Sequence, residues 1–150
     1  MKLEAELKHE HFENELLKAI LNIMVTADKI STMTNAVLKP HGISKEQFNV
    51  LRILRGKHPD PSTIQSITER MISKSSNATR LVEKLRVKGL VERVQCSDDR
   101  RKVDVVITEA GLKLLTVVDP LIRASSGSLE SNITDEEAQE LNRILDKLRG

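Results

Sequence analysis

One segment, residues 73–108, limits most strongly what this chain can fold into. It reads SKSSNATRLVEKLRVKGL and then VERVQCSDDRRKVDVVIT, so a basic amphipathic stretch precedes a glycine and two alternating apolar runs around a charged tip. Gly89 suits the left-handed position that ends a helix. The alternation along residues 91–94 and 103–107 is typical of two antiparallel strands. The segment therefore predicts a helix followed by a β-hairpin, or wing.

Positive charge is concentrated in the same part of the chain. Between Arg70 and Lys102 ten Lys and Arg residues stand against four acidic ones, a local net charge of +6, whereas residues 1–69 are neutral and residues 103–150 carry −4. A charge run is usually only a solvated face, but this one coincides with the helix and hairpin. A polyanion attracts such a segment through counterion release. Nucleic acid is therefore the expected partner.

Three helices are predicted before this segment. An apolar stripe over residues 16–37 indicates a long helix that stops near Pro40. Residues 44–47, Ser-Lys-Glu-Gln, have the form of a capping box that opens a second helix. A short third helix runs from residue 63 to about residue 71, and Ser73 is expected to cap the next one. Two short helices with a tight turn between them form a helix-turn-helix pattern.

Two more helices are predicted after the hairpin. Thr108 caps the first, and Pro120 should bend it rather than end it, because the apolar period continues to Leu129. Thr134 and Glu137 form another capping box, which opens a helix that reaches the end of the chain. The fold class expected is mainly α with a small β-hairpin, built as a winged helix-turn-helix.

Composition argues against several other classes of protein. Cys96 is the single cysteine, which excludes an intramolecular disulfide framework and fits a reducing compartment. No apolar run approaches the ~20 residues that span a bilayer, and the acidic N-terminus is neither a signal nor a transit peptide. We expect a cytoplasmic protein without a membrane partner. Redox control through Cys96 is the less favoured reading, since a lone cysteine is more often incidental.

No metal, cofactor or catalytic site is expected. His9 and His11 would point about 200° apart on a helix, and His41 and His58 lie in predicted loops without a further ligand at metal-binding spacing. No nucleophile and base pair or phosphate-binding loop can be recognised. An enzyme is therefore improbable.

Residues 99–111, DRRKVDVVITEAG, carry a more specific signal. They resemble the wing signature D-x-R-x-x-x-V-x-I followed by T-x-x-G of the MarR (multiple antibiotic resistance regulator) family of winged-helix bacterial transcription factors. LVEKL at 81–85, KGLVER at 88–93 and ITDEE at 133–137 are similar as well, so the resemblance covers nearly the whole chain. Thr68 stands where many relatives have Ala. The aromatic side chains that often line the family's ligand pockets are missing, which argues against a large aromatic effector.

The resemblance implies a two-fold homodimer whose N- and C-terminal helices interlock. It places the recognition helices in successive major grooves and the wings over flanking minor grooves. The apolar stripes of the first and the last two helices point the same way, because they are too extensive for one small lobe to cover. The expected division of the single domain 1–150 is a DNA-binding lobe at residues 44–108 and dimerisation helices at residues 1–40 and 109–150.

The candidate DNA-binding residues fall into two groups. Short polar side chains and cations at the start of the recognition helix can reach base edges or phosphates in a major groove; these are Ser73, Lys74, Ser75, Ser76, Asn77, Thr79 and Arg80. In the wing, Asp99 is expected to orient Arg101 into a narrow minor groove, while Arg100 and Lys102 contact phosphate. The alternatives are a hairpin salt bridge for the Asp99–Arg101 pair and a simple N-cap for Ser73. Lys84, Arg86 and Lys88 are assigned to solvent or phosphate.

The function expected is a ligand-responsive repressor that binds a palindromic operator in double-stranded DNA as a homodimer. A small-molecule effector would enter between the lobe and the dimer helices, near the end of the first helix, the helix around Phe48 and the start of the helix after Thr108. The alternative is a winged-helix protein-interaction module that does not bind DNA. Salt dependence separates the two, because DNA binding weakens by orders of magnitude between ~50 and ~200 mM salt.

Overall fold

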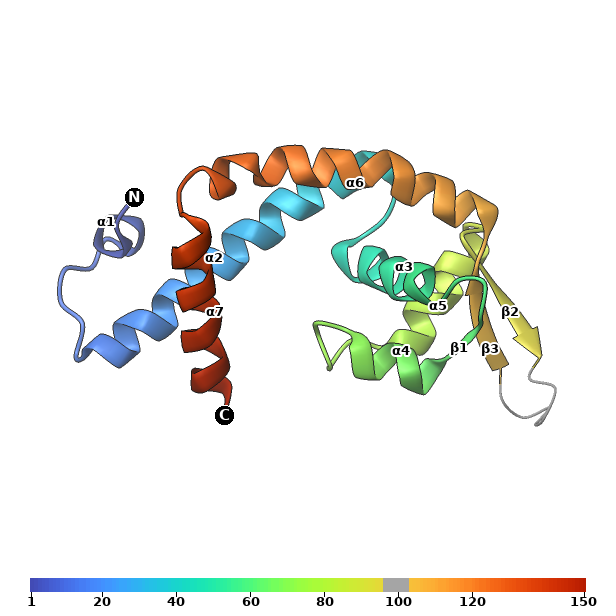
Figure 1. The fold of residues 1–150 in the computed structure, drawn as a ribbon, viewed down its shortest axis with the longest axis horizontal. Coiled ribbons are helices and arrows are strands. Elements are labelled where there is room, and N and C mark those ends of the chain that lie inside the picture. Colours follow the sequence, from blue (N-terminus) through green and yellow to red (C-terminus); the bar gives the residue numbers. More distant parts are fainter. Residues whose placement is uncertain (96–102) are drawn as a thin grey trace.

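Two long helices connect the two ends of the molecule in the computed structural model, which describes residues 1–95 and 103–150 (Figure 1). They are α2 (Glu15–Leu38) and α6 (Glu109–Glu130), and they lie side by side. At one end stand α1 (Leu3–Leu7) and α7 (Asp135–Arg149). The other end holds a compact lobe of short helices and a small sheet.

The lobe has the winged helix-turn-helix order that the sequence predicts. A 3₁₀ turn, η1 (Lys39–His41), leads from α2 into α3 (Lys45–Lys57), and α4 (Ile64–Arg70) and α5 (Ala78–Val87) follow. The sheet is antiparallel with strand order β1-β3-β2, and Val91 pairs with Ile107 while Gln95 pairs with Val103. Its strands are β1 (Ser62–Thr63), β2 (Val91–Gln95) and β3 (Val103–Ile107). The mainly α fold with a small wing is confirmed.

The two capping boxes are present as predicted. The Ser44 hydroxyl accepts a hydrogen bond from the Gln47 amide at 3.1 Å, and Gln47 Oε1 accepts the Ser44 N–H at 3.2 Å. Thr134 and Glu137 make the same reciprocal pair at the start of α7. These bonds satisfy amides that the helix itself leaves unpaired, so the starts of α3 and α7 are set by local sequence.

The start of α6 depends on a close approach as well as on a cap. Thr108 Oγ1 accepts a hydrogen bond from the Gly111 N–H at 3.1 Å. A Cβ on Gly111 would stand 2.4 Å from the Leu90 carbonyl oxygen and 2.6 Å from Ile107 Cγ1. Only glycine fits here, which gives a physical reason for the glycine of the T-x-x-G pattern. Farther on, α6 continues through Pro120 and follows a curved path (Figure 1).

The hydrophobic core lies in the lobe and at its junction with the long helices. The elements α3, α4, α5, β2 and β3 of the lobe each contribute a buried apolar side chain, and α2 and α6 add residues from the ends that meet the lobe. The fully buried side chains are Leu38, Val50, Leu51, Leu54, Ile67, Met71, Val82, Leu85, Val91, Val105, Leu115 and Val118. In contrast, α7 buries none of its residues.

The recognition helix begins later than predicted. Ser73 does not cap it; instead the Asn77 side chain accepts a hydrogen bond from the Arg80 N–H at 3.0 Å, and Ala78 is the first helical residue. Asn caps a helix about as well as Ser, and Ala78 is buried against the core. Packing therefore selects the later cap, and the residues before Asn77 form a turn.

Two short elements were not predicted. β1 pairs Ser62 with Val105 and Thr63 with Asp104, which adds a third strand to the hairpin. A two-residue strand has no periodicity for a pattern to reveal. The five-residue helix α1 is equally short, and it is attached to α2 through an ion pair between Glu4 and Lys18 at 2.6 Å.

Candidate nucleic-acid interface

The recognition helix α5 has a buried apolar face and an exposed polar face. Ala78, Val82 and Leu85 are buried, as the sequence predicts. Because these positions recur at three- and four-residue steps, the intervening side chains of Thr79 and Arg80 point outward and are exposed. Lys84 is exposed on the next turn. The helix thus has one side fixed in the core and one side free for a ligand.

The turn from α4 into α5 is held by its own hydrogen bonds. The Ile72 N–H donates to Asn49 Oδ1 at 2.9 Å, which ties the turn to α3. The Ser76 N–H donates to the Ser73 carbonyl at 3.2 Å, and the Ser73 and Ser75 hydroxyls lie 3.3 Å apart. Four of the residues predicted for the start of the helix, Ser73, Lys74, Ser75 and Ser76, therefore lie on a tight turn in front of it.

Two arginines form ion pairs with the same carboxylate of the recognition helix. Glu83 on α5 binds Arg86 at 2.7 Å and Arg93 of β2 at 2.8 Å. The hydrogen bond from Arg86, supported by the charges of Arg86 and Arg93, holds the pKa of the Glu83 carboxyl below its ordinary value. Glu83 is therefore ionised at neutral pH and connects the recognition helix to the first strand of the wing.

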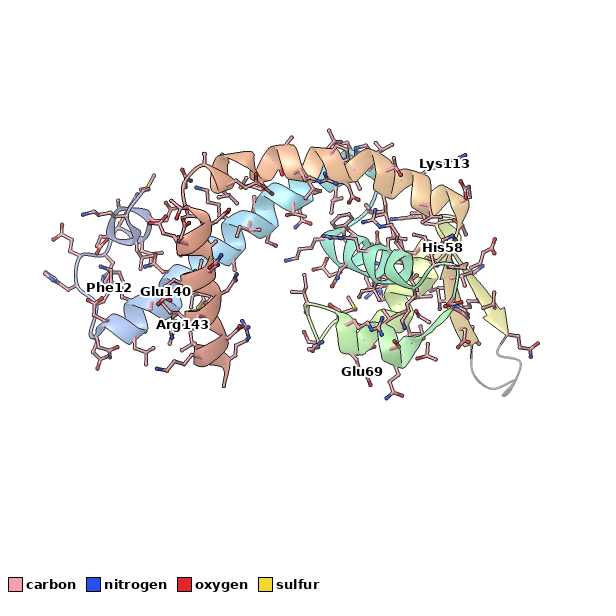
Figure 2. All side chains as sticks on the ribbon, viewed as in Figure 1. Phe12, His58, Glu69, Lys113, Glu140 and Arg143 are labelled. Atoms are coloured by element: carbon pink, nitrogen blue, oxygen red, sulfur yellow. The ribbon has the colours of Figure 1, made fainter. Side chains whose placement is uncertain are left out.

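Lysines 74 and 88 are also engaged. The Lys88 ammonium donates to the Gly42 carbonyl and to Gln47 Oε1, the latter at 3.0 Å. The Lys74 ammonium donates to the Glu69 carbonyl at the end of α4, a residue labelled in Figure 2. Lys88, which was assigned to solvent or phosphate, thus joins the end of α5 to the loop before α3.

Arg80 and Lys84 differ from these cations, because their side chains make no such contact with the described residues. Within residues 1–95 and 103–150, neither side chain takes part in a hydrogen bond or an ion pair. Both line a shallow polar hollow beside the first turn of α3, together with Ser44, Gln47, Ser76 and Asn77. Two cations and several short polar side chains from two helices therefore share one exposed surface.

Five residues with predicted roles lie outside the described residues, between the two strands of the wing in the sequence: Cys96, Asp99, Arg100, Arg101 and Lys102. The pairing of Asp99 with Arg101 and any redox role of Cys96 stay predictions. The strands on both sides are described, and their register from Val91–Ile107 to Gln95–Val103 establishes the hairpin that carries these residues.

Other kinds of site receive no support from the part of the chain that the structure covers. There, no three His, Cys, Asp or Glu side chains come together in a way that could hold a metal ion. No helix among the described residues is both long enough and apolar enough to cross a membrane.

Sequence reasoning missed the contacts that position this surface. The Asn49 bond to Ile72 and the Glu83 bond to Arg93 join residues that are far apart in sequence. The Glu83 and Arg86 spacing of three residues is a recognisable helix pair, so that half of the contact had a local signal. The other contacts became visible only with the fold.

Comparison with known proteins extends the resemblance over the chain. The MarR family model matches residues 43–103. The chain is 28% identical over 132 residues to the HTH-type transcriptional regulator MhqR of Bacillus subtilis, covering 88% of this chain and 90% of that protein. It is 27% identical over 141 residues to the transcriptional repressor MprA of Escherichia coli, covering 94% and 80% respectively.

The fold is also similar to solved structures of MarR proteins. A MarR transcription factor from Planctomyces limnophilus has a TM-score of 0.70 and 29% identity, covering 91% of this chain and 98% of that chain. A mutant MarR from E. coli complexed with operator DNA has a TM-score of 0.78 and 26% identity, covering 93% and 99%. Both the lobe and the flanking helices are shared with these proteins. The chain is therefore similar, in sequence and in fold, to the winged helix-turn-helix transcriptional regulators of the MarR family.

Proposed function

We propose that this protein is a sequence-specific transcriptional repressor that binds operator DNA as a homodimer in the cytoplasm. The observation that carries the proposal is the exposed cationic face of α5, where Arg80 and Lys84 stand beside Ser76 and Asn77. Repression is the activity named for the similar protein MprA, and a similar MarR has been seen on operator DNA. Occupation of a promoter by the dimer would exclude polymerase.

The proposed DNA contacts come from the turn, the helix and the wing. Side chains at the helix start would read base edges and phosphates in the major groove, and the wing would place Arg101 in the minor groove. The contact residues proposed are Ser73, Lys74, Ser75, Ser76, Asn77, Thr79, Arg80, Asp99, Arg100, Arg101 and Lys102.

A second copy of the chain is proposed to cover the apolar end of the molecule. Leu16 and Ile23 of α2 and Leu141, Ile144 and Leu148 of α7 line an apolar groove and are 36–58% exposed. Such a surface is costly in water, and a two-fold contact buries the same residues on both copies. Residues 44–108 would then be the DNA-binding lobe, and residues 1–40 and 109–150 the dimerisation helices.

The dimer predicts the form of the operator. A two-fold protein binds half-sites related by a dyad, with centres about one helical turn or ~10 bp apart. A small-molecule effector is proposed to act by preferring one spacing of the two recognition helices over another. The expected crevice is occupied by core side chains here, because Leu38, Phe48 and Leu115 are buried together. An effector that enters there must rearrange them.

The experiment that tests DNA binding removes one cation at a time. Arg80→Ala should weaken binding to a duplex selected by the protein from a random pool by about 10- to 100-fold and lower the salt slope by about one. Lys113→Ala is the matched control, because Lys113 lies on the far side of α6 from the recognition helix (Figure 2). Affinity should be followed by fluorescence anisotropy between ~50 and ~200 mM salt.

Two results would contradict the proposal. Equal affinities of the two variants would remove Arg80 from the interface. Failure of the protein to enrich any duplex, with weak salt dependence of whatever binding remains, would favour the protein-interaction module instead.

A further inference from the structure

The surface around the recognition helix contains one apolar side chain that the fold does not use. Ile72 is 90% exposed, the highest value for a large hydrophobic residue in the described chain after Met1. Its neighbour Met71 is 1% exposed and belongs to the core. The chain therefore turns from the interior to the surface between these two residues, and the aliphatic side chain of Ile72 is left in solvent.

The outward position of Ile72 is held by the backbone. Its N–H donates to Asn49 Oδ1 at 2.9 Å. The Met71 N–H before it donates to the Ile67 carbonyl at 3.1 Å, and the tight turn at Ser73 follows at once. Because both sides are bonded, the side chain is presented on a constrained backbone, and little conformational entropy would be lost when a partner covers it.

Ile72 belongs to the same surface as the proposed DNA contacts. It lines a shallow hollow with Glu46, Asn49 and Ser73, and Glu46 also lines the hollow of Ser76, Asn77 and Arg80. Figure 1 shows the connection between α4 and α5 on the side of the lobe that faces away from α6. The apolar stripes of α2 and α7, proposed to meet a second copy, lie at the other end of the molecule.

We propose that Ile72 is a specificity-determining residue that reads the 5-methyl group of a thymine in the major groove. This inference rests on the proposed function. The base-edge features of a major groove are hydrogen-bonding groups apart from the thymine methyl, which is the apolar one. An aliphatic side chain among polar neighbours can gain free energy there only by excluding water from that methyl. Its counterpart in the second copy reads the symmetry-related thymine of the other half-site.

The test combines a protein change with a removal of the same methyl from DNA. A duplex selected by the wild type from a random pool is resynthesised with each thymine replaced in turn by deoxyuridine, which lacks only the methyl. Wild-type affinity should fall by about fourfold per half-site at one symmetry-related position, the equivalent of one buried methyl group. Ile72→Ala should bind the thymine duplex roughly tenfold more weakly and show no further loss on the deoxyuridine duplex.

Two control variants separate this role from a general effect. Val87→Ala alters another exposed aliphatic residue, 74% exposed at the far end of α5, and should keep the full response to deoxyuridine. Ile72→Val should keep most of it. Thermal unfolding of all three variants should match the wild type, because the altered side chains lie outside the core.

Failure of the inference can be told from failure of the proposed function. Ile72 does not read a methyl group if Ile72→Ala binds the thymine duplex as tightly as the wild type does. The same conclusion follows if Ile72→Ala loses as much affinity as the wild type on each deoxyuridine duplex. In both cases the proposed DNA binding stands. The inference also fails if replacing the thymines of the selected site by deoxyuridine never lowers the affinity of the wild type. If the wild type selects no duplex, the proposed function fails and this inference fails with it.

Discussion

Helices α5 and α7 have the same kind of sequence and very different surroundings. Both are amphipathic, with apolar residues at three- and four-residue steps. In α5 these residues are buried within the lobe, with Val82 and Leu85 completely inaccessible. In α7, Leu141, Ile144 and Leu148 are 47–48% exposed. An apolar stripe thus predicts that one face of a helix will be buried. It does not predict whether that face packs against its own chain or against a second one.

The two ends of the molecule should therefore depend on protein concentration differently. The lobe has a core of its own, so its stability is intramolecular. In the proposed dimer, the end formed by α1, α7 and the first part of α2 gains its missing contacts by association, which follows mass action. Three experiments test the two ends of the molecule and the junction between them.

The largest effect is expected from a charge in the apolar groove. Ile144→Glu would place a carboxylate in each half of the proposed dimer contact, and an unpaired charge taken out of water costs several kcal/mol. The dimer dissociation constant, measured by analytical ultracentrifugation, should rise by at least about 1000-fold. Arg143→Gln is the control, because it removes only the exposed pair with Glu140 on the same helix (Figure 2) and should change association little. An unaltered dimer in Ile144→Glu would mean that α7 does not form the interface.

A smaller effect, independent of concentration, is expected in the lobe. Leu85→Ala removes a fully buried side chain of α5 and should lower the free energy of unfolding by about 3 kcal/mol. Urea denaturation at two protein concentrations tenfold apart should give the same loss at each. A loss that grows on dilution would show that the lobe, too, relies on the second copy.

The smallest effect is expected where the two ends join. Arg55 of α3 and Asp119 of α6 form an ion pair at 2.6 Å with side chains 36% and 20% exposed. Their coupling in a double-mutant cycle of Arg55→Gln and Asp119→Asn should be about 1 kcal/mol in urea denaturation. The Arg149 and Asp146 pair, which is 69% and 70% exposed on α7, should show almost none. Equal coupling in both pairs would deny the junction any special role in holding the lobe to α6.

Local signals predicted much of the fold. The capping boxes at Ser44 and Thr134 act within one helical turn, so four residues are enough to place each helix start. Gly89 ends α5 with φ +73°, and the Leu90 and Gly89 amides donate to the Leu85 and Arg86 carbonyls as the left-handed ending requires. The antiparallel pairing of the two hairpin strands likewise followed from their alternation, whereas the register came from the structure.

The site was only partly predictable because contacts between distant segments choose among residues that are locally equivalent, as Ser73 and Lys88 illustrate. Ser73 and Asn77 are both good caps, and local chemistry alone cannot choose between them. Burial of Ala78 makes the choice. Lys88 has nothing in its neighbourhood of sequence to distinguish it from Lys84, and its partners Gly42 and Gln47 lie more than forty positions away.

Except for the start of the recognition helix, the amino-acid sequence by itself determined where the main helices begin and end, which faces are apolar, and where positive charge collects. Each of these depends on residues within a few positions of one another. The tertiary structure decided which cations of the described residues form hydrogen bonds or ion pairs within the fold and which form none. It also left Ile72 in solvent and α7 uncovered. These outcomes depend on contacts between distant segments, whose geometry exists only once the chain has folded.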